Sequence, residues 1–218
     1  MGRVGPAITD VQFEGERILL RLRDGRTLSA PLSWAGPEVA SMDDAARARW
    51  VCTDDGTGVN WPAVGHSSSE GVISAWALEE DALYEGALND LRAAHRDVSL
   101  LTERSRLLVA LWRLVADGCN GGLMQFLGNW GPDEVQVAIE ALSVVGAVRT
   151  LAVVRAFWDA VAPLAESEAV NTWDGVWEAV ENAGLSAHLD DLDAEFWEAA
   201  PELTRRVPLY FGPAPSAQ

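Results

Sequence analysis

Few side chains in this sequence could do chemistry, and a metal-binding histidine would be the first candidate. The chain holds three histidines, which are His66, His95 and His188. Only His188 lies close in sequence to carboxylates, those of Asp190, Asp191 and Asp193. A histidine with aspartates can bind a divalent metal, but the usual zinc and calcium motifs are missing from the sequence. Aspartates at the start of a helix instead cap its first turn and favour its positive end, so we expect no metal site.

A cysteine nucleophile would be another route to catalysis. Cys119 is followed by Asn120, but no histidine lies near it in sequence. A nucleophilic thiol needs a lowered pKa, and a small buried thiol is the ordinary alternative. No serine-hydrolase, phosphate-loop or dinucleotide-binding motif is found either. We therefore expect no cofactor and no enzyme activity. A small-molecule-binding or catalytic pocket near Asn120 and Gln125 is the weakest alternative.

The densest cluster of unusual residues lies between Asp117 and Phe126. Asn-Gly and Gly-Gly steps supply positive φ at low steric cost, so the chain must turn sharply there. Gln125 stands among apolar residues, where an amide is either buried and hydrogen-bonded or part of a site. We favour the first interpretation. The residues of this motif, which we expect to serve folding rather than partner chemistry, are Asn120, Gly121, Gly122, Gln125 and Phe126.

The elements that must position this motif follow a helical pattern. Apolar residues at three- and four-residue steps predict a helix over 79–97, with His95 partly buried on its inner stripe. Thr102 is expected to cap the next helix, and Gly131, followed by proline, to precede another that Gly146 ends. Further helices are predicted over 148–161, 173–182 and 192–200. The expected caps of the last two are Asn171 or Thr172, and Asp190, and a loop is expected at Pro163 and 166–168.

The first part of the chain alternates with a period of two instead. The three runs with this pattern are 8–13, 18–22 and 27–32. Asp24-Gly25 between the last two is a strong hairpin signal. A short helix is predicted over 43–50, and short strands over 51–53 and 59–61. The predicted fold class is therefore α+β, with a small β-rich module over 1–78 followed by an all-helical acidic domain over 79–218.

The chain contains ten tryptophans, each of which either packs in the core or is exposed. Four fall at core-facing spacing within predicted helices, and we expect most of them to pack inside: Trp112, Trp158, Trp177 and Trp197. Trp130 and Trp173 fall at helix edges, where aromatic residues also act as interface anchors. The sequence alone does not separate these two roles.

Acidic residues are distributed unevenly along the chain. The net charge is −17, and all sixteen basic residues are arginines. Residues 1–77 carry ten acids and seven arginines, whereas residues 78–218 carry twenty-three acids and nine arginines. Between Asp159 and Glu202 there are twelve acids and no base. Such a surface repels nucleic acids and anionic membranes and attracts a basic partner.

Two features favour a cytoplasmic location. The first residues, beginning Met1-Gly2-Arg3, contain no apolar segment typical of a signal peptide. The two cysteines, Cys52 and Cys119, lie far apart and form no disulfide framework or zinc motif.

The glycine-rich motif also resembles the signature of the DNA-mimic-protein-19-like family (domain of unknown function 4375). The matching residues are Asn120-Gly121-Gly122, Gln125-Phe126, Asn129 and Gly131, then Ala141-Leu142, Val145-Gly146-Ala147, Leu192-Asp193, Phe196-Trp197 and Tyr210. The resemblance spans roughly residues 84–212. It implies an all-helical fold, and the family's namesake is an acidic protein that imitates DNA towards a transcription factor.

The first part resembles a second family, the domain of unknown function 2442. The matching residues are Leu22, Asp24-Gly25, Pro31-Leu32, Trp50, Gly58-Val59, Trp61-Pro62 and Ser67–Ser69. The resemblance spans roughly residues 7–76 and implies a fold but no reaction. Relatives often carry acids after the Trp-Pro pair, where this chain has Val64-Gly65-His66-Ser67.

Together these observations predict an acidic protein that binds other proteins, with DNA mimicry towards a basic DNA-binding protein as the leading hypothesis. The predicted partner-binding residues are Glu178, Glu181, Asp190, Asp191, Asp193, Glu195, Glu198 and Glu202. Glu195, Glu198 and Glu202 would rise along one side of a helix by about 4.5 and 6 Å, comparable to the spacing of phosphates on one DNA strand. The alternative is an antitoxin-like or immunity-like neutraliser that recognises its partner by shape. Direct nucleic-acid and membrane binding are not expected, and a homodimer is compatible with the sequence.

Overall fold

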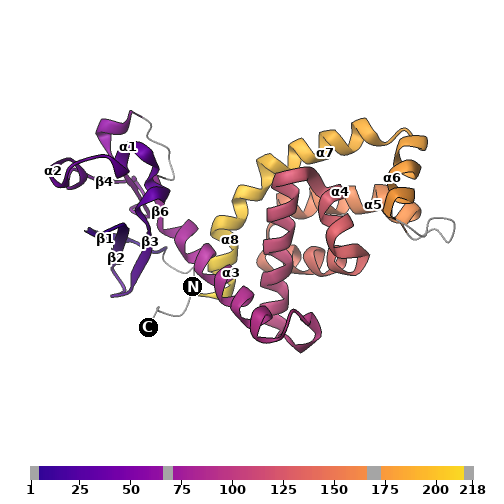
Figure 1. Ribbon diagram of the computed structural model, residues 1–218, viewed down its shortest axis with the longest axis horizontal. Helices are drawn as coiled ribbons and strands as arrows, with labels where there is room; N and C mark the ends of the chain where they lie inside the picture. Colours follow the sequence, from indigo (N-terminus) through magenta and orange to yellow (C-terminus); the bar gives the residue numbers. More distant parts are fainter. Residues whose placement is uncertain (1–4, 66–70, 166–172, 214–218) are drawn as a thin grey trace. The chain divides into compact units, whose positions relative to one another are not determined.

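The computed structural model describes residues 5–65, 71–165 and 173–213, and its elements are labelled in Figure 1. The chain forms two compact units, one running to Leu83 and the other covering Tyr84–Phe211. Small sheets over residues 8–74 are followed by helices over residues 75–211, which confirms the predicted α+β class. The division between the units falls inside a helix, a few residues after the boundary predicted at 78/79. Whether the two parts are separable stays a prediction.

Two three-stranded antiparallel sheets form the first unit (Figure 1). The first sheet has the order β1-β2-β3 and consists of β1 (Ile8–Glu14), β2 (Arg17–Leu22) and β3 (Thr27–Pro31). The second has the order β4-β5-β6 and consists of β4 (Val51–Cys52), β5 (Gly58–Asn60) and β6 (Ile73–Ser74). Gly25 has a φ of +88° in the turn between β2 and β3, so the predicted Asp-Gly hairpin is confirmed.

Short helical segments fill the connections of this unit. They are the 3-10 turns η1 (Leu32–Ala35) and η2 (Pro62–Val64) and the helices α1 (Gly36–Ala40) and α2 (Asp44–Arg47). Asp43 caps α2, since its Oδ1 accepts the Ala46 N–H at 2.7 Å. The predicted helix therefore begins where expected but ends at Arg47 rather than Trp50. The core of the unit includes Ile18, Leu20 and Val59.

Helix α3 (Ala75–Ala93) begins four residues earlier than predicted and ends four residues earlier. Its predicted apolar stripe is confirmed, because Leu83, Ala87 and Leu91 are buried. His95 is a correction. It lies beyond the helix end with a φ of +53°, and its side chain is exposed rather than partly buried.

Helix α4 (Glu103–Val145) is a chain of three helical segments rather than one rod. Its backbone leaves helical geometry at Gly121 and Gly122, and again at Gly131, which has a φ of +81°. Thr102 caps its start by accepting the Ser105 N–H at 3.2 Å, and Gly146 ends it with a φ of +73°. The sharp turn, the start at Gly131 and both end signals are thus confirmed. Helix α4 has the length and apolarity of a membrane span. However, 61% of its most apolar 18-residue stretch is buried inside the protein, as in a core helix.

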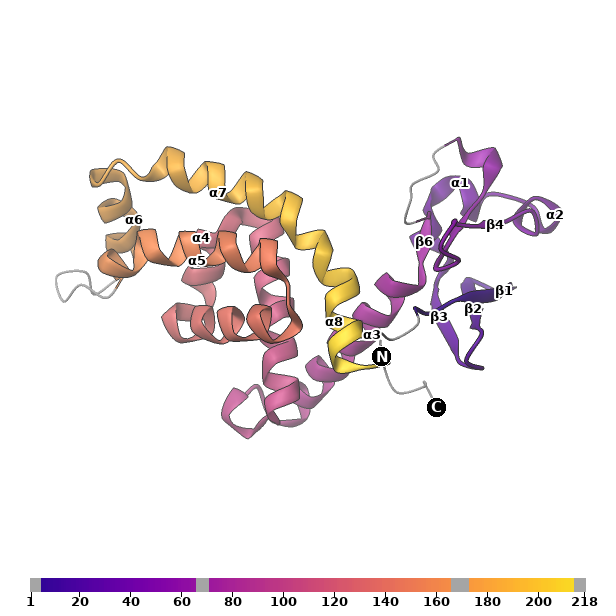
Figure 2. The same ribbon diagram turned by 180° about the vertical axis from the view of Figure 1, so that it is seen from behind.

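The remaining elements complete the helical unit (Figures 1 and 2). They are η3 (Val98–Leu100), α5 (Val148–Ala165), α6 (Trp173–Asn182), α7 (Ser186–Ala199), η4 (Ala200–Glu202) and α8 (Leu203–Phe211). Helix α5 packs on both α4 and α7. The largest fully buried side chains of this unit include Leu111, Leu123, Phe126, Phe157 and Phe196.

The predicted loops and caps of the helical unit differ from the structure at Pro163 and at Asp190. Helix α5 continues past Val161 and through Pro163, so no loop begins at that proline. Asp190 lies inside α7, which begins at Ser186, and the prediction that it caps the helix is wrong. The predicted caps Asn171 and Thr172 and the predicted loop at 166–168 lie outside the described residues.

Candidate functional site

The glycine pair of the motif breaks α4 so that a new helical segment can begin at Leu123. Gly122 has a φ of +85°, a region that favours glycine, whereas Gly121 has a φ of −146°. The positive φ expected within this Asn-Gly-Gly stretch is therefore found at Gly122 and not at Gly121. A Cβ on Gly121 would first meet the amide oxygen at the flexible end of Gln125. A Cβ on Gly122 would collide with the carboxylate of Asp193.

Asp193 explains why that space must stay empty. Its Oδ1 accepts the N–H of Leu123 at 2.8 Å, across 70 residues of sequence. This N–H belongs to the first turn of the new segment and has no helical partner of its own. Burial raises the pKa of Asp193, and the negative charge of Asp190 adds to the rise, while the hydrogen bond from Leu123 opposes it. Asp193 thus caps α4 from the side of α7.

Gly118, one turn before the break, gives α7 a second close contact. A Cβ built on Gly118 would lie 2.6 Å from Cε1 of Phe196. Phe196 is completely buried, so its ring has little room to move away. Asp193 and Phe196, about one turn apart on α7, thus lie against Gly122 and Gly118, which are about one turn apart on α4. Two distant stretches of the family signature are therefore parts of one helix contact.

A polar network ties the three segments of α4 together. Asp117 accepts two hydrogen bonds, from Nε2 of Gln125 at 3.0 Å and from Nε1 of Trp130 at 2.6 Å. The Arg113 guanidinium lies 3.7 Å from the centre of the Trp130 ring and donates to Oε1 of Glu134 at 2.8 Å. Because the partners stand on different segments, the network fixes both bends. This geometry supports a folding role for Gln125.

Three members of the network, Arg113, Asp117 and Glu134, were not singled out from the sequence. The side chain of Arg113 is only 8% exposed and that of Glu134 11%. A lone arginine inside the apolar run 107–115 was the signal that could have found them. Buried charges are rare unless they are paired, so its presence implies a carboxylate partner nearby.

The environment of Cys119 is unlike that of a nucleophile. Burial raises the pKa of the Cys119 thiol, and partial burial does the same to the pKa of Cys52. A raised pKa keeps the thiol protonated at neutral pH, which is the opposite of activation. Asn120, beside it, is exposed. Within the described residues, no three His, Cys, Asp or Glu side chains gather as metal ligands would.

The structure separates the predicted partner-binding acids into two groups. Six are exposed: Glu178 and Glu181 on α6, and Asp190, Asp191, Glu195 and Glu198 on α7. The other two, Asp193 and Glu202, are half-buried and hydrogen-bonded inside the unit. Their carboxylates serve other helices, so they are less available to a partner.

Glu202 caps α5 in the way that Asp193 caps α4. Its Oε1 accepts the N–H of Thr150 at 2.8 Å and the Thr150 hydroxyl at 2.9 Å. Glu202 also lies in η4 and not in α7, which ends at Ala199. The predicted ladder of Glu195, Glu198 and Glu202 on one helix is therefore corrected. Asp191, Glu195 and Glu198 form the corresponding row within α7.

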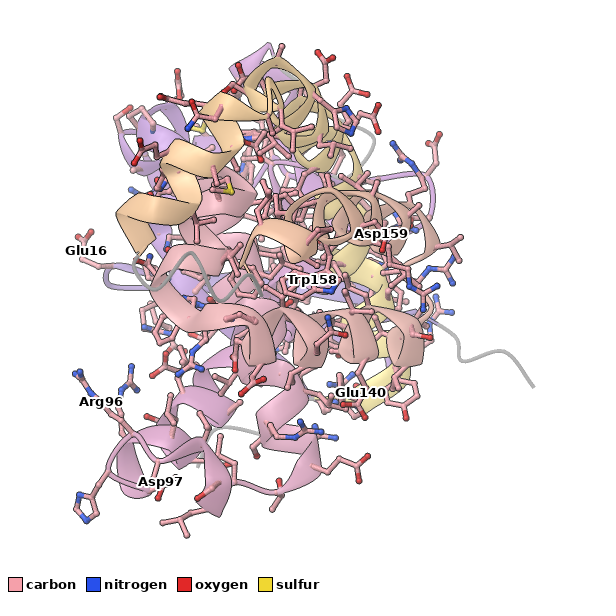
Figure 3. All side chains as sticks on the ribbon, turned by 90° about the vertical axis from the view of Figure 1, so that its right-hand side faces the viewer. Glu16, Arg96, Asp97, Glu140, Trp158 and Asp159 are labelled. Atoms are coloured by element: carbon pink, nitrogen blue, oxygen red, sulfur yellow. The ribbon has the colours of Figure 1, made fainter. Side chains whose placement is uncertain are left out.

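Exposure of the tryptophans departs most from the prediction. Trp112 is 36% exposed, Trp177 43% and Trp197 60%, so these three are not core residues. Trp158 on α5 is half-buried (Figure 3). Trp130 is 39% exposed while its indole N–H is bound by Asp117. Of Trp173, the other predicted anchor, no side-chain placement is described.

Comparison with known proteins identifies the family. The model of the family described as DMP19-like protein matches residues 99–211, more than half of the chain, and the chain belongs to that family. The model described as protein of unknown function (DUF2442) matches residues 8–68. Both resemblances found in the sequence are thereby confirmed. No curated protein and no solved structure matches the chain.

Proposed function

We propose that the helical unit binds a basic DNA-binding protein through the exposed acids of α6 and α7, and that it does so as a mimic of DNA. The observation that carries this proposal is the row of six exposed carboxylates on these helices. No arginine or lysine lies between Trp173 and Glu202 to neutralise them. Unneutralised like charges on one surface cost stability, which favours a role in recognition.

Spacing supports mimicry on α7. Leu189, Leu192, Phe196 and Ala199 face the core, whereas Asp191, Glu195 and Glu198 lie outside this buried stripe and are exposed. These three rise by about 6 and 4.5 Å along the helix. Phosphates on one DNA strand rise by about 3.4 Å each, so a helix offers a sparser but similar row of negative charges. Membership of the DMP19-like family is a second support.

The test compares two variants with the same loss of charge. The first carries Asp191→Asn, Glu195→Gln and Glu198→Gln, which leave the internal caps Asp193 and Glu202 untouched. The control removes three exposed acids of the first unit by Glu16→Gln, Glu38→Gln and Asp54→Asn. Both variants and the wild type are immobilised and used to capture proteins from the source cells at low salt.

The proposal predicts that wild type and control retain the same basic protein, while the α7 variant retains several-fold less of it. Retention should fall as salt rises, because exposed charges are screened beyond about 8 Å at physiological ionic strength. Equal retention by all three proteins, or retention indifferent to salt, would reject the α7 row as the binding surface.

A second candidate function, a shape-specific neutraliser, is favoured by the exposed tryptophans. Trp177 and Trp197 stand beside acidic residues on α6 and α7, and tryptophan is enriched among the residues that dominate binding energy. A rearrangement that keeps the number of acids separates the two functions. The double variant Glu195→Ala with Ala194→Glu moves one charge by one position. A DNA mimic should tolerate this change, whereas a shape-specific neutraliser should lose affinity with it and with Trp197→Ala.

A further inference from the structure

Strand β1 is an outer strand whose second edge is only partly covered. In the sheet order β1-β2-β3, β1 pairs with β2 alone. Glu14 pairs with Arg17 across the two-residue turn Gly15-Glu16, and Gln12 pairs with Leu19. A two-residue hairpin makes the first pair a hydrogen-bonded one, and such pairs alternate along an antiparallel ladder. The backbone groups of Val11 and Phe13 therefore point away from β2.

Part of this edge is already occupied. At its beginning, the Ile8 N–H donates to the carbonyl of Gly56 at 2.8 Å. The Val11 N–H donates to Oδ1 of Asp10 at 2.9 Å. Within the described part of the chain, no hydrogen bond engages the outward N–H of Phe13 or the outward carbonyls of Val11 and Phe13. These three groups could pair with an added strand.

A groove runs beside these free groups. It has a volume of about 560 Å³ and is lined by residues 10–14 of β1 together with Asp44, Ala48 and Trp50. Its far wall is α2, which is held in place by two contacts of Arg47. The Arg47 guanidinium donates to the Ala40 carbonyl at 2.6 Å, and the Arg47 carbonyl accepts from Nε1 of Trp61 at 2.8 Å. An edge strand facing a helix across a groove is the arrangement that binds peptides by strand addition.

The acidic lining of the groove favours a basic ligand. Three acidic residues, Asp10, Glu14 and Asp44, are among those that line it, and no basic residue is. Two arginines contact residues of the lining. Nη2 of Arg21 donates to Oε1 of Gln12 at 3.0 Å, and Nη1 of Arg47 lies 3.9 Å from Asp44 while its other nitrogens are used by carbonyls of α1. Trp50 and Ala48 add apolar side chains to the lining. A peptide with alternating basic and apolar side chains matches this pattern, because alternate residues of a strand face the same way.

We propose that this groove binds an extended, basic segment of a partner protein, which joins the sheet as a fourth strand beside β1. The segment's backbone pairs with Val11 and Phe13, and its arginine or lysine side chains contact Glu14 and Asp44. The inference concerns the first unit and is independent of the function proposed for α6 and α7.

The probe is a phage-displayed library of random heptapeptides, selected on the full-length protein. Basic peptides could also bind the acidic helices, so the library is first depleted on the variant Ala48→Trp. Ala48 is exposed, and the larger side chain fills the groove without entering the core. Circular dichroism checks that this variant is folded. Peptides that survive depletion report on the groove alone.

The selected peptides should carry arginine or lysine at alternate positions and lose binding when alternate backbone nitrogens are methylated. Glu14→Gln with Asp44→Asn should weaken them about fivefold or more, given the usual strength of charge-assisted contacts. Glu16→Gln is the matched control, because this exposed side chain projects from the neighbouring turn and does not line the groove (Figure 3). Hydrogen exchange at the Phe13 amide should slow in the complex.

Three results would overturn the proposal. One is a selection that yields no peptide able to distinguish the wild type from Ala48→Trp. Another is binding that ignores the Glu14 and Asp44 substitutions or leaves exchange at Phe13 unchanged. The third is a wild-type dimer that Ala48→Trp converts to a monomer, because the edge would then serve a second copy of the chain.

Discussion

At the scale of single residues, the Asn-Gly-Gly motif interrupts helix α4 and leaves space beside Gly122 for the carboxylate of Asp193. Gly122 supplies the backbone conformation, and Asp193 occupies the space that a side chain there would take. Gly118 plays the matching part for Phe196. These contacts give a structural role to matching residues on α4 and α7.

Gly122→Ala should therefore destabilise the protein. With a φ of +85° and a ψ of 173°, Gly122 has a conformation that is essentially restricted to glycine and costs about 1–3 kcal/mol for a residue with a Cβ. Displacement of the Asp193 carboxylate adds the loss of a helix cap. The control is Gly86→Ala in α3, where a Cβ meets nothing within 4 Å and helix propensity should add up to about 1 kcal/mol. Urea unfolding of both variants measures the difference. A Gly122→Ala protein as stable as the wild type would contradict the role given to the break.

The raised pKa of Asp193 should make the stability of the protein depend on pH. Its pKa is raised in the folded state, chiefly by burial. A group of this kind contributes stability that is complete below its unfolded pKa and is lost as pH rises through the folded pKa. The side-chain amide of an Asp193→Asn variant can still accept the Leu123 N–H but carries no charge. As pH rises through the Asp193 pKa, the wild type loses this contribution and the Asp193→Asn variant does not. The free energy of unfolding of the variant should therefore increase relative to that of the wild type.

Asp193→Ala provides the comparison at one pH. Without an acceptor, the Leu123 N–H loses its cap, and stability should fall by about 0.5–2 kcal/mol. Chemical unfolding between about pH 3 and pH 8, a range that spans the titration of carboxyl groups, measures both variants by tryptophan fluorescence. A difference between the Asp193→Asn variant and the wild type that does not change with pH would show that Asp193 has an ordinary pKa.

At the scale of elements, periodicity predicted most helices and strands because it depends on neighbours three, four or two residues away. The ends of α4 and the β2–β3 hairpin were found through local signals, a threonine cap and glycines with positive φ. Strand β6 and the helices α1 and α8 were not predicted. Strand β6 and helix α1 are too short to show a full period, and they lack the local turn and cap signals that indicated β4, β5 and α2. Asp190 was chosen as a cap because it is an aspartate near a predicted start, but α7 had already begun at Ser186.

The features of the site that sequence could not supply depend on distant contacts. Asp193 and Leu123 are 70 residues apart, and Glu202 and Thr150 are 52 apart. No local pattern indicates that these two acids serve as caps while Asp191 and Glu198 face outward. The prediction that most of the helical tryptophans are buried was wrong for a related reason. Periodicity places Trp197 beside Phe196, but only the packed structure shows that Phe196 takes the buried position.

One ion pair at the element scale should matter far more than the others. Glu79 at the start of α3 is 1% exposed and pairs with Arg26 in the turn between β2 and β3. Arg26→Ala would leave a buried carboxylate without its cation, so we expect a loss of about 3 kcal/mol or more. The control is Arg92→Ala, which breaks the exposed Arg92–Glu85 pair on the same helix and should cost less than about 1 kcal/mol.

Thermal and urea unfolding of the two arginine variants measure this contrast. The double variant Arg26→Met with Glu79→Gln should recover part of the loss, because it removes both charges together. Equal stability of Arg26→Ala and Arg92→Ala would mean that the buried carboxylate is compensated in some other way.

At the scale of the whole molecule, charge is unevenly distributed along the chain. The region 78–218 has a net charge of −14, from twenty-three acids and nine arginines, against −3 in the first 77 residues. The sequence predicted this asymmetry fully, because charge needs only counting. It did not predict which acids are available, and the structure assigns six of the eight candidates to the surface.

We expect the acids of α6 and α7 to occupy the DNA-binding face of a basic protein. A competition titration tests this, in which the captured partner is bound to a fluorescent DNA duplex and this protein is added. The wild type should displace the duplex, and the variant of Asp191, Glu195 and Glu198 should need several-fold higher concentrations. The control variant of Glu16, Glu38 and Asp54 should act like the wild type. A complex that holds DNA and this protein together, or displacement that is equal for all three proteins, would contradict this expectation.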